Sequence, residues 1–208
     1  NFYVIKRSIF LFKKKFLWKF FTFLYLNKIY SFFDYVKDEP YVLVKENIKF
    51  PHINLGSDLD IYTEDTDTFS KLIKNYFDSK NINITKNLNQ KGNVHVDLFY
   101  YNKFIYKFDL YDLNYDSKIF NSEFIKSVLN NKEIKKFKYF KIRNIYVPSV
   151  VMDIIIRVFE IQKFPDKLHH KEKLTSYDKD FVLAASRKIS NYTKGNLSLT
   201  FSEIFEND

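Results

Sequence analysis

The stretch Gly56–Ile61, with the sequence Gly-Ser-Asp-Leu-Asp-Ile, decides how the rest of the chain is interpreted. Its polar and apolar residues alternate, which is typical of a β-strand with one face in the core. Side chains two positions apart on a strand point to the same side. Asp58 and Asp60 therefore share one face, and Leu59 and Ile61 lie on the other. The segment predicts a strand that is apolar toward the core and acidic on its outer face.

Adjacent carboxylates of this kind predict a divalent-metal site. Two carboxylates side by side repel each other, and a cation bound between them removes the repulsion. Their hard oxygen atoms suit Mg²⁺ or Mn²⁺. Gly56 and Ser57 supply a tight turn, backbone N–H groups and a hydroxyl that can face a phosphate. The alternative interpretation is an edge strand with solvated aspartates, because an Asp-X-Asp pattern alone often arises by chance.

Segments on both sides of the acidic strand predict an α+β fold, with a small mixed or antiparallel sheet and flanking helices. Predicted strands cover Tyr41–Val44, Leu55–Tyr62, Ile82–Ile84, a hairpin of Val94–Tyr100 and Phe104–Leu110, and a second hairpin of Phe137–Ile142 and Ile145–Val147. Predicted helices cover residues 4–36, the segment after an N-cap at Asp65 or Thr66, Glu123–Leu129, Val150–Gln162 and Asp178–Ser190, and Lys163–Ser176 is expected to be a basic loop.

We expect three parts along the chain. Residues 1–38 form a basic, aromatic helical segment, residues 39–147 form the core, and residues 148–208 form a C-terminal helical part. The chain contains only three glycines, so a Gly-rich phosphate loop of the P-loop or dinucleotide-binding type is excluded.

The composition is that of a basic globular protein. Of 208 residues, 46% are hydrophobic and 28% are charged, which favours a folded core over disorder. The net charge of +9 suits phosphate-rich ligands, nucleic acid or an anionic membrane face, although a genomic bias toward lysine explains it equally well. The absence of cysteine excludes disulfides and thiol catalysis and fits a reducing, cytoplasmic location. The first residue is Asn1 and not methionine, which fits either a trimmed chain or a piece of a longer protein.

Residues 10–33 are rich in lysine and aromatic side chains, and they allow two interpretations. The most apolar stretch, Phe16 to Phe33, contains Lys19 and Lys28, whereas a bilayer span needs about 20 mostly apolar residues. No small-residue cleavage site of a signal peptide follows it. Core-packing helices are the simpler interpretation. An interfacial helix with snorkelling lysines would instead place the protein at the inner face of a membrane.

A Gly-Ser followed by Asp-hydrophobic-Asp-hydrophobic, running into a helix, resembles the nucleotidyltransferase superfamily, whose best-known member is DNA polymerase beta. That family usually places some ten residues between the Gly-Ser and the paired carboxylates, whereas Ser57 directly precedes Asp58 here. The short form is similar to uncharacterised bacterial nucleotidyltransferase-like proteins associated with surface-polysaccharide genes, in which a strand like Tyr41–Val44 precedes the motif. The resemblance covers about Leu24 to Leu110.

The resemblance implies a third carboxylate on a neighbouring strand, which completes the metal site and can accept the proton of the attacking hydroxyl. Asp97 matches that pattern best, because it lies between apolar residues on an expected central strand, where an unpartnered charge is costly. Asp109, on the following strand, is the competitor, and Asp112 and Asp116 follow further along. His95 shares a face with Asp97, where it can touch substrate or be an ordinary surface histidine.

Basic residues are expected to approach the phosphates from outside the sheet. The candidates are Lys45, Arg157, Lys163 and Lys167. Arg157 and Lys163 flank Glu160 at a spacing of three, so the three side chains can share one helix face. Such a group can hold phosphates, or it can form a solvated ion pair.

Together these residues predict a Mg²⁺- or Mn²⁺-dependent enzyme that moves an NMP group from a nucleoside triphosphate to a hydroxyl of a sugar, metabolite or protein. One alternative is a phosphocholine-type phosphotransferase on a related fold, although the acidic run and the Gly-Thr-Leu-Leu-Gly-like stretch of that family are absent here. Another alternative is a non-catalytic module that binds nucleotide or nucleic acid through basic charge and aromatic stacking.

Overall fold

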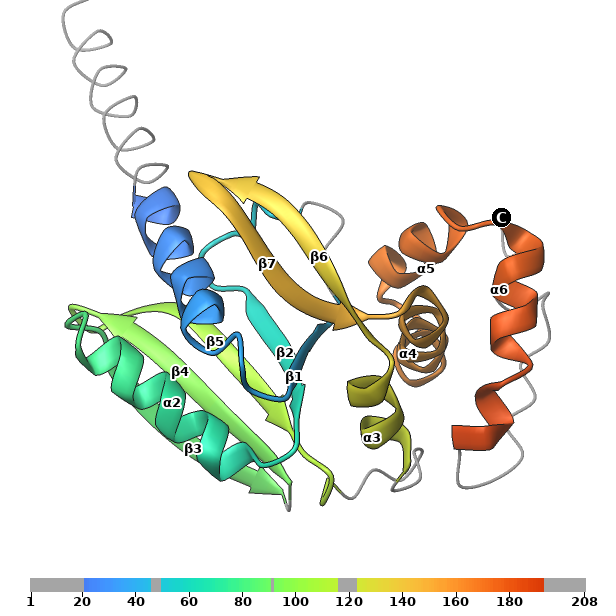
Figure 1. The fold of residues 1–208 in the computed structure, drawn as a ribbon, viewed down its shortest axis with the longest axis horizontal. Coiled ribbons are helices and arrows are strands. Elements are labelled where there is room, and N and C mark those ends of the chain that lie inside the picture. Colours follow the sequence, from blue (N-terminus) through green and yellow to red (C-terminus); the bar gives the residue numbers. More distant parts are fainter. Residues whose placement is uncertain (1–20, 46–49, 91, 116–122, 193–208) are drawn as a thin grey trace, which may run out of the picture.

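The fold is α+β, as predicted. The computed structural model describes residues 21–45, 50–90, 92–115 and 123–192. They form a five-stranded sheet, a two-stranded ribbon and the helices packed around them (Figure 1). Of the helix predicted over residues 4–36, residues 21–35 are helical, and residues 1–20 lie outside the described part of the chain. Within the described residues, every helix is too short or too polar to cross a bilayer.

The five-stranded sheet has the order β1-β2-β5-β4-β3. Strand β2 runs parallel to β5, and all other neighbouring strands are antiparallel. β4 and β5 form the predicted hairpin, which turns at Tyr101 and Asn102. The strands are β1 (Tyr41–Val44), β2 (Asp58–Thr63), β3 (Asn83–Gln90), β4 (Asn93–Tyr100) and β5 (Lys103–Tyr111).

In the five-stranded sheet, two strand boundaries differ from the prediction by more than one residue. β2 begins at Asp58 and not at Leu55, because residues 55 and 56 are part of a turn. β3 continues to Gln90, well beyond the predicted end at Ile84. Pairing with β4 extends this strand, since its polar sequence has no apolar run that would indicate a strand by itself.

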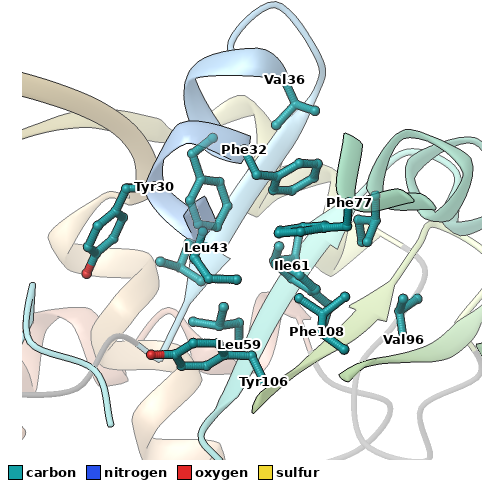
Figure 2. Packing of buried hydrophobic residues seen from close by; sticks show 14 of the residues in the cluster. Tyr30, Phe32, Val36, Leu43, Leu59, Ile61, Phe77, Val96, Tyr106 and Phe108 are labelled. Atoms are coloured by element: carbon teal, nitrogen blue, oxygen red, sulfur yellow. The ribbon is translucent and has the colours of Figure 1, made fainter. Parts of the chain in front are cut away.

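One face of the sheet is covered by the helix of residues 21–35 and by α2 (Thr66–Asp78). Asp65 caps α2, as one of the two predictions stated, and its side chain accepts the Thr68 N–H at 2.6 Å. Figure 2 shows Phe32 of the N-terminal helix packed against Phe77 of α2 and Phe108 of β5. The N-terminal helix therefore belongs to the same apolar core as the sheet.

The opposite face is covered in part by the C-terminal helices, which pack on Val42, Val44 and Tyr62. The segment predicted as a basic loop, Lys163–Ser176, contains a helix instead. It folds because His170 and Leu174, four residues apart, are both buried on one side of it. The helices of this part are α3 (Glu123–Asn130), α4 (Val150–Lys163), α5 (Leu168–Thr175), α6 (Lys179–Ser186) and the 3-10 helix η1 (Ile189–Tyr192).

The ribbon of β6 (Lys132–Tyr139) and β7 (Lys141–Pro148) turns at Phe140, three residues earlier than predicted. The prediction placed Arg143 in the turn, but it lies inside β7. Its buried guanidinium pairs with Asp34 and donates to Asn27 Oδ1 at 2.6 Å on the N-terminal helix. These tertiary contacts, which have no local signal, favour the observed register.

Candidate functional site

Alternate residues of β2, β5 and β4 place charged side chains on the sheet face opposite the N-terminal helix. Asp60 lies opposite Asp109 in the parallel ladder, and Asp109 lies opposite His95. One row away, Asp58 lies opposite Lys107. Residues opposite each other in a ladder point to the same side of the sheet. We call these five residues the charged face.

Lys107 supplies the positive charge between two of the carboxylates. Its Nζ lies 3.2 Å from Asp58 Oδ2 and 3.1 Å from Asp109 Oδ2. Burial alone would lower the pKa of Lys107, but the carboxylates of Asp109 and Asp58 outweigh it and raise that pKa. Sequence reasoning missed this residue. The spacing in the sequence could have indicated it. Lys107 precedes Asp109 by two residues, as Asp58 precedes Asp60, so the two side chains share one face of the strand.

Lys45 holds Asp60 from the other side and connects the sheet to α4. Its Nζ lies 3.0 Å from Asp60 Oδ1 and 3.2 Å from Glu160 Oε1. Burial alone would lower the pKa of Lys45, but Asp60 and Glu160 raise it well above its ordinary value. Burial raises the pKa of Asp60, and the charge of Lys45 offsets only part of that rise. The ammonium group therefore stays charged between two partly buried acids.

Glu160 in turn binds a second lysine at the mouth of the site. Lys167 Nζ lies 3.2 Å from Glu160 Oε2, and its side chain is about half exposed. Burial alone would raise the pKa of Glu160, but Lys45 and Lys167 hold it below its ordinary value. Sequence reasoning placed Lys45 and Lys167 near phosphate. The structure brings both to one acid beside the charged face.

His95 belongs to the charged face through a contact between its Nδ1 and Asp109 Oδ1. The two side chains are 19% and 10% exposed, so the pair is largely shielded from water. A carboxylate at Nδ1 favours the tautomer that carries its proton there, which leaves the lone pair on Nε2. His95 is thus a partly buried partner of an acid, in contrast to the surface histidine that was the simpler interpretation of the sequence.

A pocket of about 370 Å³ opens beside the charged face, between the loop before β2 and the start of α5. Its polar wall includes Lys45, Ser57, Asp60 and His169. Its apolar wall includes Phe50. A pocket with apolar walls and a few converging charged groups is typical of a small-molecule site.

The backbone N–H groups predicted to face a phosphate are already used inside the protein. Gly56 N–H donates to the Ile105 carbonyl at 2.7 Å, and Ser57 N–H donates to the Asn54 carbonyl at 3.3 Å. Gly56 has φ of 86°, and a Cβ there would meet nothing within 4 Å. Glycine therefore serves the turn conformation. The Ser57 hydroxyl, at the pocket wall, remains a candidate phosphate ligand.

Asp97 lies farther from the acidic strand than predicted. It is on β4, which β5 separates from β2, and it pairs with Lys107 in the ladder. Asp109, the competitor, lies on β5 directly opposite Asp60. The geometry therefore favours Asp109 as the third carboxylate. Both acids have apolar neighbours in sequence, so the choice depended on a strand order that no local pattern indicates.

Several other candidates lie away from the pocket or outside the described residues. Arg157 is 1% exposed, and its Nε donates to Asp153 Oδ2 at 2.7 Å. It pairs along α4 with the residue four positions earlier, so it does not reach the pocket wall. Asp112 accepts the backbone N–H and the hydroxyl at the start of α2. Asp116 and the side chain of Lys163 lie outside the described part of the chain.

His170 connects Glu160 to the buried ion pair of Arg157. Its Nε2 lies 3.8 Å from Glu160 Oε2, and its Nδ1 lies 3.4 Å from Arg157 Nη1. Burial and the neighbouring His169 lower the pKa of His170 to about 3. The imidazole is therefore neutral at physiological pH, which allows it to lie beside an arginine.

The carboxylates present are compatible with a divalent cation if a lysine moves. Within the described residues, no three acidic or histidine side chains converge as a ready metal site. Asp58 and Asp109 nevertheless share one cation already, the ammonium group of Lys107. Their hard oxygen atoms are the ligands that Mg²⁺ and Mn²⁺ prefer. Such an ion fits the site when it takes the place of that ammonium group.

The sequence matches no protein-family model, and no curated protein matches it. The resemblance to nucleotidyltransferases therefore stays a prediction. Any assignment of an activity depends on the charged face and its pocket.

Proposed function

We propose that this chain is a metal-dependent nucleotidyltransferase, which moves an NMP group from a nucleoside triphosphate to a hydroxyl of a sugar, metabolite or protein. The observation that carries the proposal is the pair Asp60 and Asp109, which lie opposite each other on adjacent parallel strands, with Asp60 in the wall of a pocket. Asp58 adds a third carboxylate one row away on the same face. Grouping three acids at one place beside a pocket, with two of them in its wall, is expected of a binding or catalytic site.

Asp58, Asp60 and Asp109 would hold Mg²⁺ or Mn²⁺, which supplies charge neutralisation for the triphosphate. In this proposal Lys107 leaves its position between the acids when the cation and nucleotide arrive. Its side chain is one-quarter exposed, so it has room to turn toward solvent or toward a phosphate oxygen. Lys167, which is about half exposed, can turn from Glu160 to the triphosphate in the same way.

The acceptor oxygen attacks the α-phosphorus and forms a new P–O bond. The bond from that phosphorus to the oxygen bridging to the β-phosphate breaks, and pyrophosphate leaves with the bond electrons. The acceptor proton passes to a base on the charged face. His95 suits this role, because Asp109 holds its Nδ1 and Nε2 keeps a lone pair.

A nucleotide-binding module without turnover is the second candidate. It is favoured by one observation, the ion pairs that Lys107 makes with both Asp58 and Asp109. If Lys107 does not move, it keeps a divalent cation out of this position. Nucleotide would then bind through lysines at the pocket, and no group would be transferred.

The test combines thermal melting with pyrophosphate release. The full chain is mixed with Mn²⁺ and each nucleoside triphosphate, with sugars and the protein itself as acceptors. A ligand at about 100 times its Kd stabilises a protein by about 2.7 kcal/mol, which melting detects. We expect stabilisation and pyrophosphate release by the wild type. Asp60→Asn and Asp109→Asn should each lower the rate by about 100-fold or more.

Asp97→Asn is the matched control. Asp97 is also an aspartate on an inner strand of the sheet, but its strand, β4, does not neighbour β2. It should retain most of the rate. If Asp97→Asn removes activity while Asp109→Asn does not, the assignment of the third carboxylate is overturned. Stabilisation by nucleotide with no pyrophosphate release from any acceptor would support the non-catalytic candidate. No response to metal or nucleotide contradicts both.

A further inference from the structure

Bulky apolar side chains are exposed at the end of the molecule far from α4, α5 and α6. This end consists of the start of the described N-terminal helix, the β4–β5 turn and the β6–β7 turn (Figure 1). Tyr101 is 81% exposed, Ile142 is 74% exposed and Phe140 is 62% exposed. Phe21 and Phe104 are exposed to a lesser degree. We call these five residues the aromatic end.

Ring contacts hold both turns against the helix, so the three segments form one surface. The rings of Phe23 and Phe140 have centroids 4.2 Å apart, and the Tyr139 hydroxyl donates to the Phe23 carbonyl at 3.3 Å. On the other side, the centroids of Tyr25 and Tyr100 are 5.2 Å apart. The exposed side chains therefore extend from segments that contact one another.

Both turns place an aromatic residue where the backbone favours glycine or asparagine. Tyr101 has φ of 45° and Phe140 has φ of 62°. Large side chains are uncommon in this left-handed region because of steric cost. Contacts within the protein offset only part of that cost, since both side chains are mostly exposed. Their presence points to a partner outside the chain.

The charge of this surface is positive. The three segments, residues 21–28, 99–104 and 136–142, contain five lysines and no acidic residue. Among the described residues only one of these lysines, Lys141, pairs with a carboxylate, that of Asp34. Lys28 lies beside the rings of Tyr25 and Tyr100, and burial together with the charge of nearby Lys80 lowers its pKa. The partner should therefore be anionic.

Exposed aromatic and aliphatic side chains among lysines suit a lipid surface better than nucleic acid. Phe and Ile side chains enter the boundary between headgroups and acyl chains, and lysines reach the lipid phosphates. Aromatic rings also stack on bases, but an exposed aliphatic side chain such as Ile142 adds nothing to stacking. The combination favours a membrane.

We propose that the aromatic end docks on the surface of an anionic lipid bilayer. Tyr101, Phe140 and Ile142 enter the headgroup boundary, and Lys103 and Lys138 bind lipid phosphates. This inference does not depend on the proposed transferase activity, because none of these residues lines the pocket.

Vesicle flotation of the full chain tests the proposal. Vesicles of neutral phosphatidylcholine are compared with vesicles containing phosphatidylglycerol, at low and high salt. We expect the protein to float with the anionic vesicles at low salt and to be released at high salt. Lys138→Glu should weaken binding by roughly fivefold or more, as expected for one basic residue at an anionic surface. Tyr101→Asn with Phe140→Asn should weaken it by roughly tenfold or more.

Phe140→Asn also removes the ring contact with Phe23, so the melting temperature of the double variant is measured beside that of Tyr101→Asn alone, which keeps this contact and replaces Tyr101 by a residue that tolerates positive φ. Phe181→Asn on α6 and Lys188→Glu in the turn after α6, both at exposed positions, are the matched controls and should float like the wild type. The proposal is overturned if the wild type fails to float with anionic vesicles, or if the aromatic-end variants float as well as the controls. It is also overturned if these variants lose only binding to a single-stranded oligonucleotide.

Discussion

The two faces of the five-stranded sheet are built from alternating residues of the same strands, and they differ in what covers them. On one face, Ile61 and Phe108 are fully buried beneath α2 and the N-terminal helix. On the other, Asp60 lines a pocket, and both Asp60 and Asp109 form ion pairs with lysines. The apolar face stabilises the fold by burial. The charged face gains little net stability, because desolvation offsets most of the attraction between buried ions.

This difference indicates what each face is for. A protein that needed only stability could place apolar residues on both faces of β2 and β5. Grouping three acids and their lysine partners instead, with Asp58 and Asp60 in the wall of a pocket, is a feature expected of a binding or catalytic site. The predictions below test whether the apolar face, the buried polar groups and the charged face behave differently.

Phe108→Ala is expected to have the largest effect. Its ring packs against both Phe32 and Phe77 in the core, as Figure 2 shows, so truncation leaves a cavity. The free energy of unfolding should fall by about 3–5 kcal/mol. Urea denaturation measures it. Lys107→Gln, one residue earlier on the other face, should lower it by less than about 1 kcal/mol. Equal losses would mean that the two faces contribute alike to stability.

Arg157→Leu is expected to have the second-largest effect on the free energy of unfolding. It leaves Asp153 buried with a hydrogen bond from Tyr177 but without its guanidinium partner. Loss of one partner from a buried ion pair should lower the free energy of unfolding by about 3 kcal/mol. Lys74→Met is the matched control, because Lys74 pairs with Asp78 at the same spacing of four on the surface of α2. Lys74→Met should lower the free energy of unfolding by less than about 0.5 kcal/mol. If Lys74→Met lowers the free energy of unfolding as much as Arg157→Leu does, burial does not explain the difference between the two ion pairs.

His170 should make stability depend on pH. Its folded pKa of about 3 lies below the ordinary value of 6.5. Below pH 6.5 the unfolded chain binds a proton that the folded chain excludes, so stability is lost as pH falls from 6.5 toward 3. Between pH 7 and pH 5 the loss from this residue should be about 2 kcal/mol.

His170→Gln should remove that part of the pH dependence, which urea denaturation at pH 7 and pH 5 measures. His52→Gln, at an exposed histidine, should keep the wild-type dependence. If both variants lose stability between these pH values as the wild type does, His170 is not the group responsible.

Lys107→Gln is expected to have the smallest effect and tests the charged face directly. It removes the ammonium group from between Asp58 and Asp109. Apparent Mn²⁺ affinity, measured by calorimetry, should increase by roughly five- to thirtyfold, because each ion pair at a partly exposed site contributes up to about 1 kcal/mol. Lys103→Gln, on the same strand at the hairpin turn, should leave it unchanged. Weaker Mn²⁺ binding by Lys107→Gln would show that the lysine supports the site.

Local pattern was sufficient for the elements on which the site is built. The alternation around Asp58 predicted β2, Asp65 was one of two predicted caps of α2, and the β4–β5 hairpin formed as expected. The cap and the hairpin depend on contacts between residues close in sequence, and the strand was indicated by its own alternation of polar and apolar residues. The β6–β7 turn, by contrast, was predicted near Arg143, whose ion pair with Asp34 bridges distant segments. Helix α5 was missed because its sequence is polar except where it meets α4.

The sequence by itself determined that Asp58 and Asp60 share a face, because side-chain direction along a strand follows from backbone geometry alone. Only the tertiary structure decided which other charges join them. The strand order brought Asp109 and Lys107 to β2 and kept Asp97 one strand away. The docking of α4 brought Glu160 to Lys45. Strand order and docking depend on long-range packing, and no short stretch of sequence specifies them.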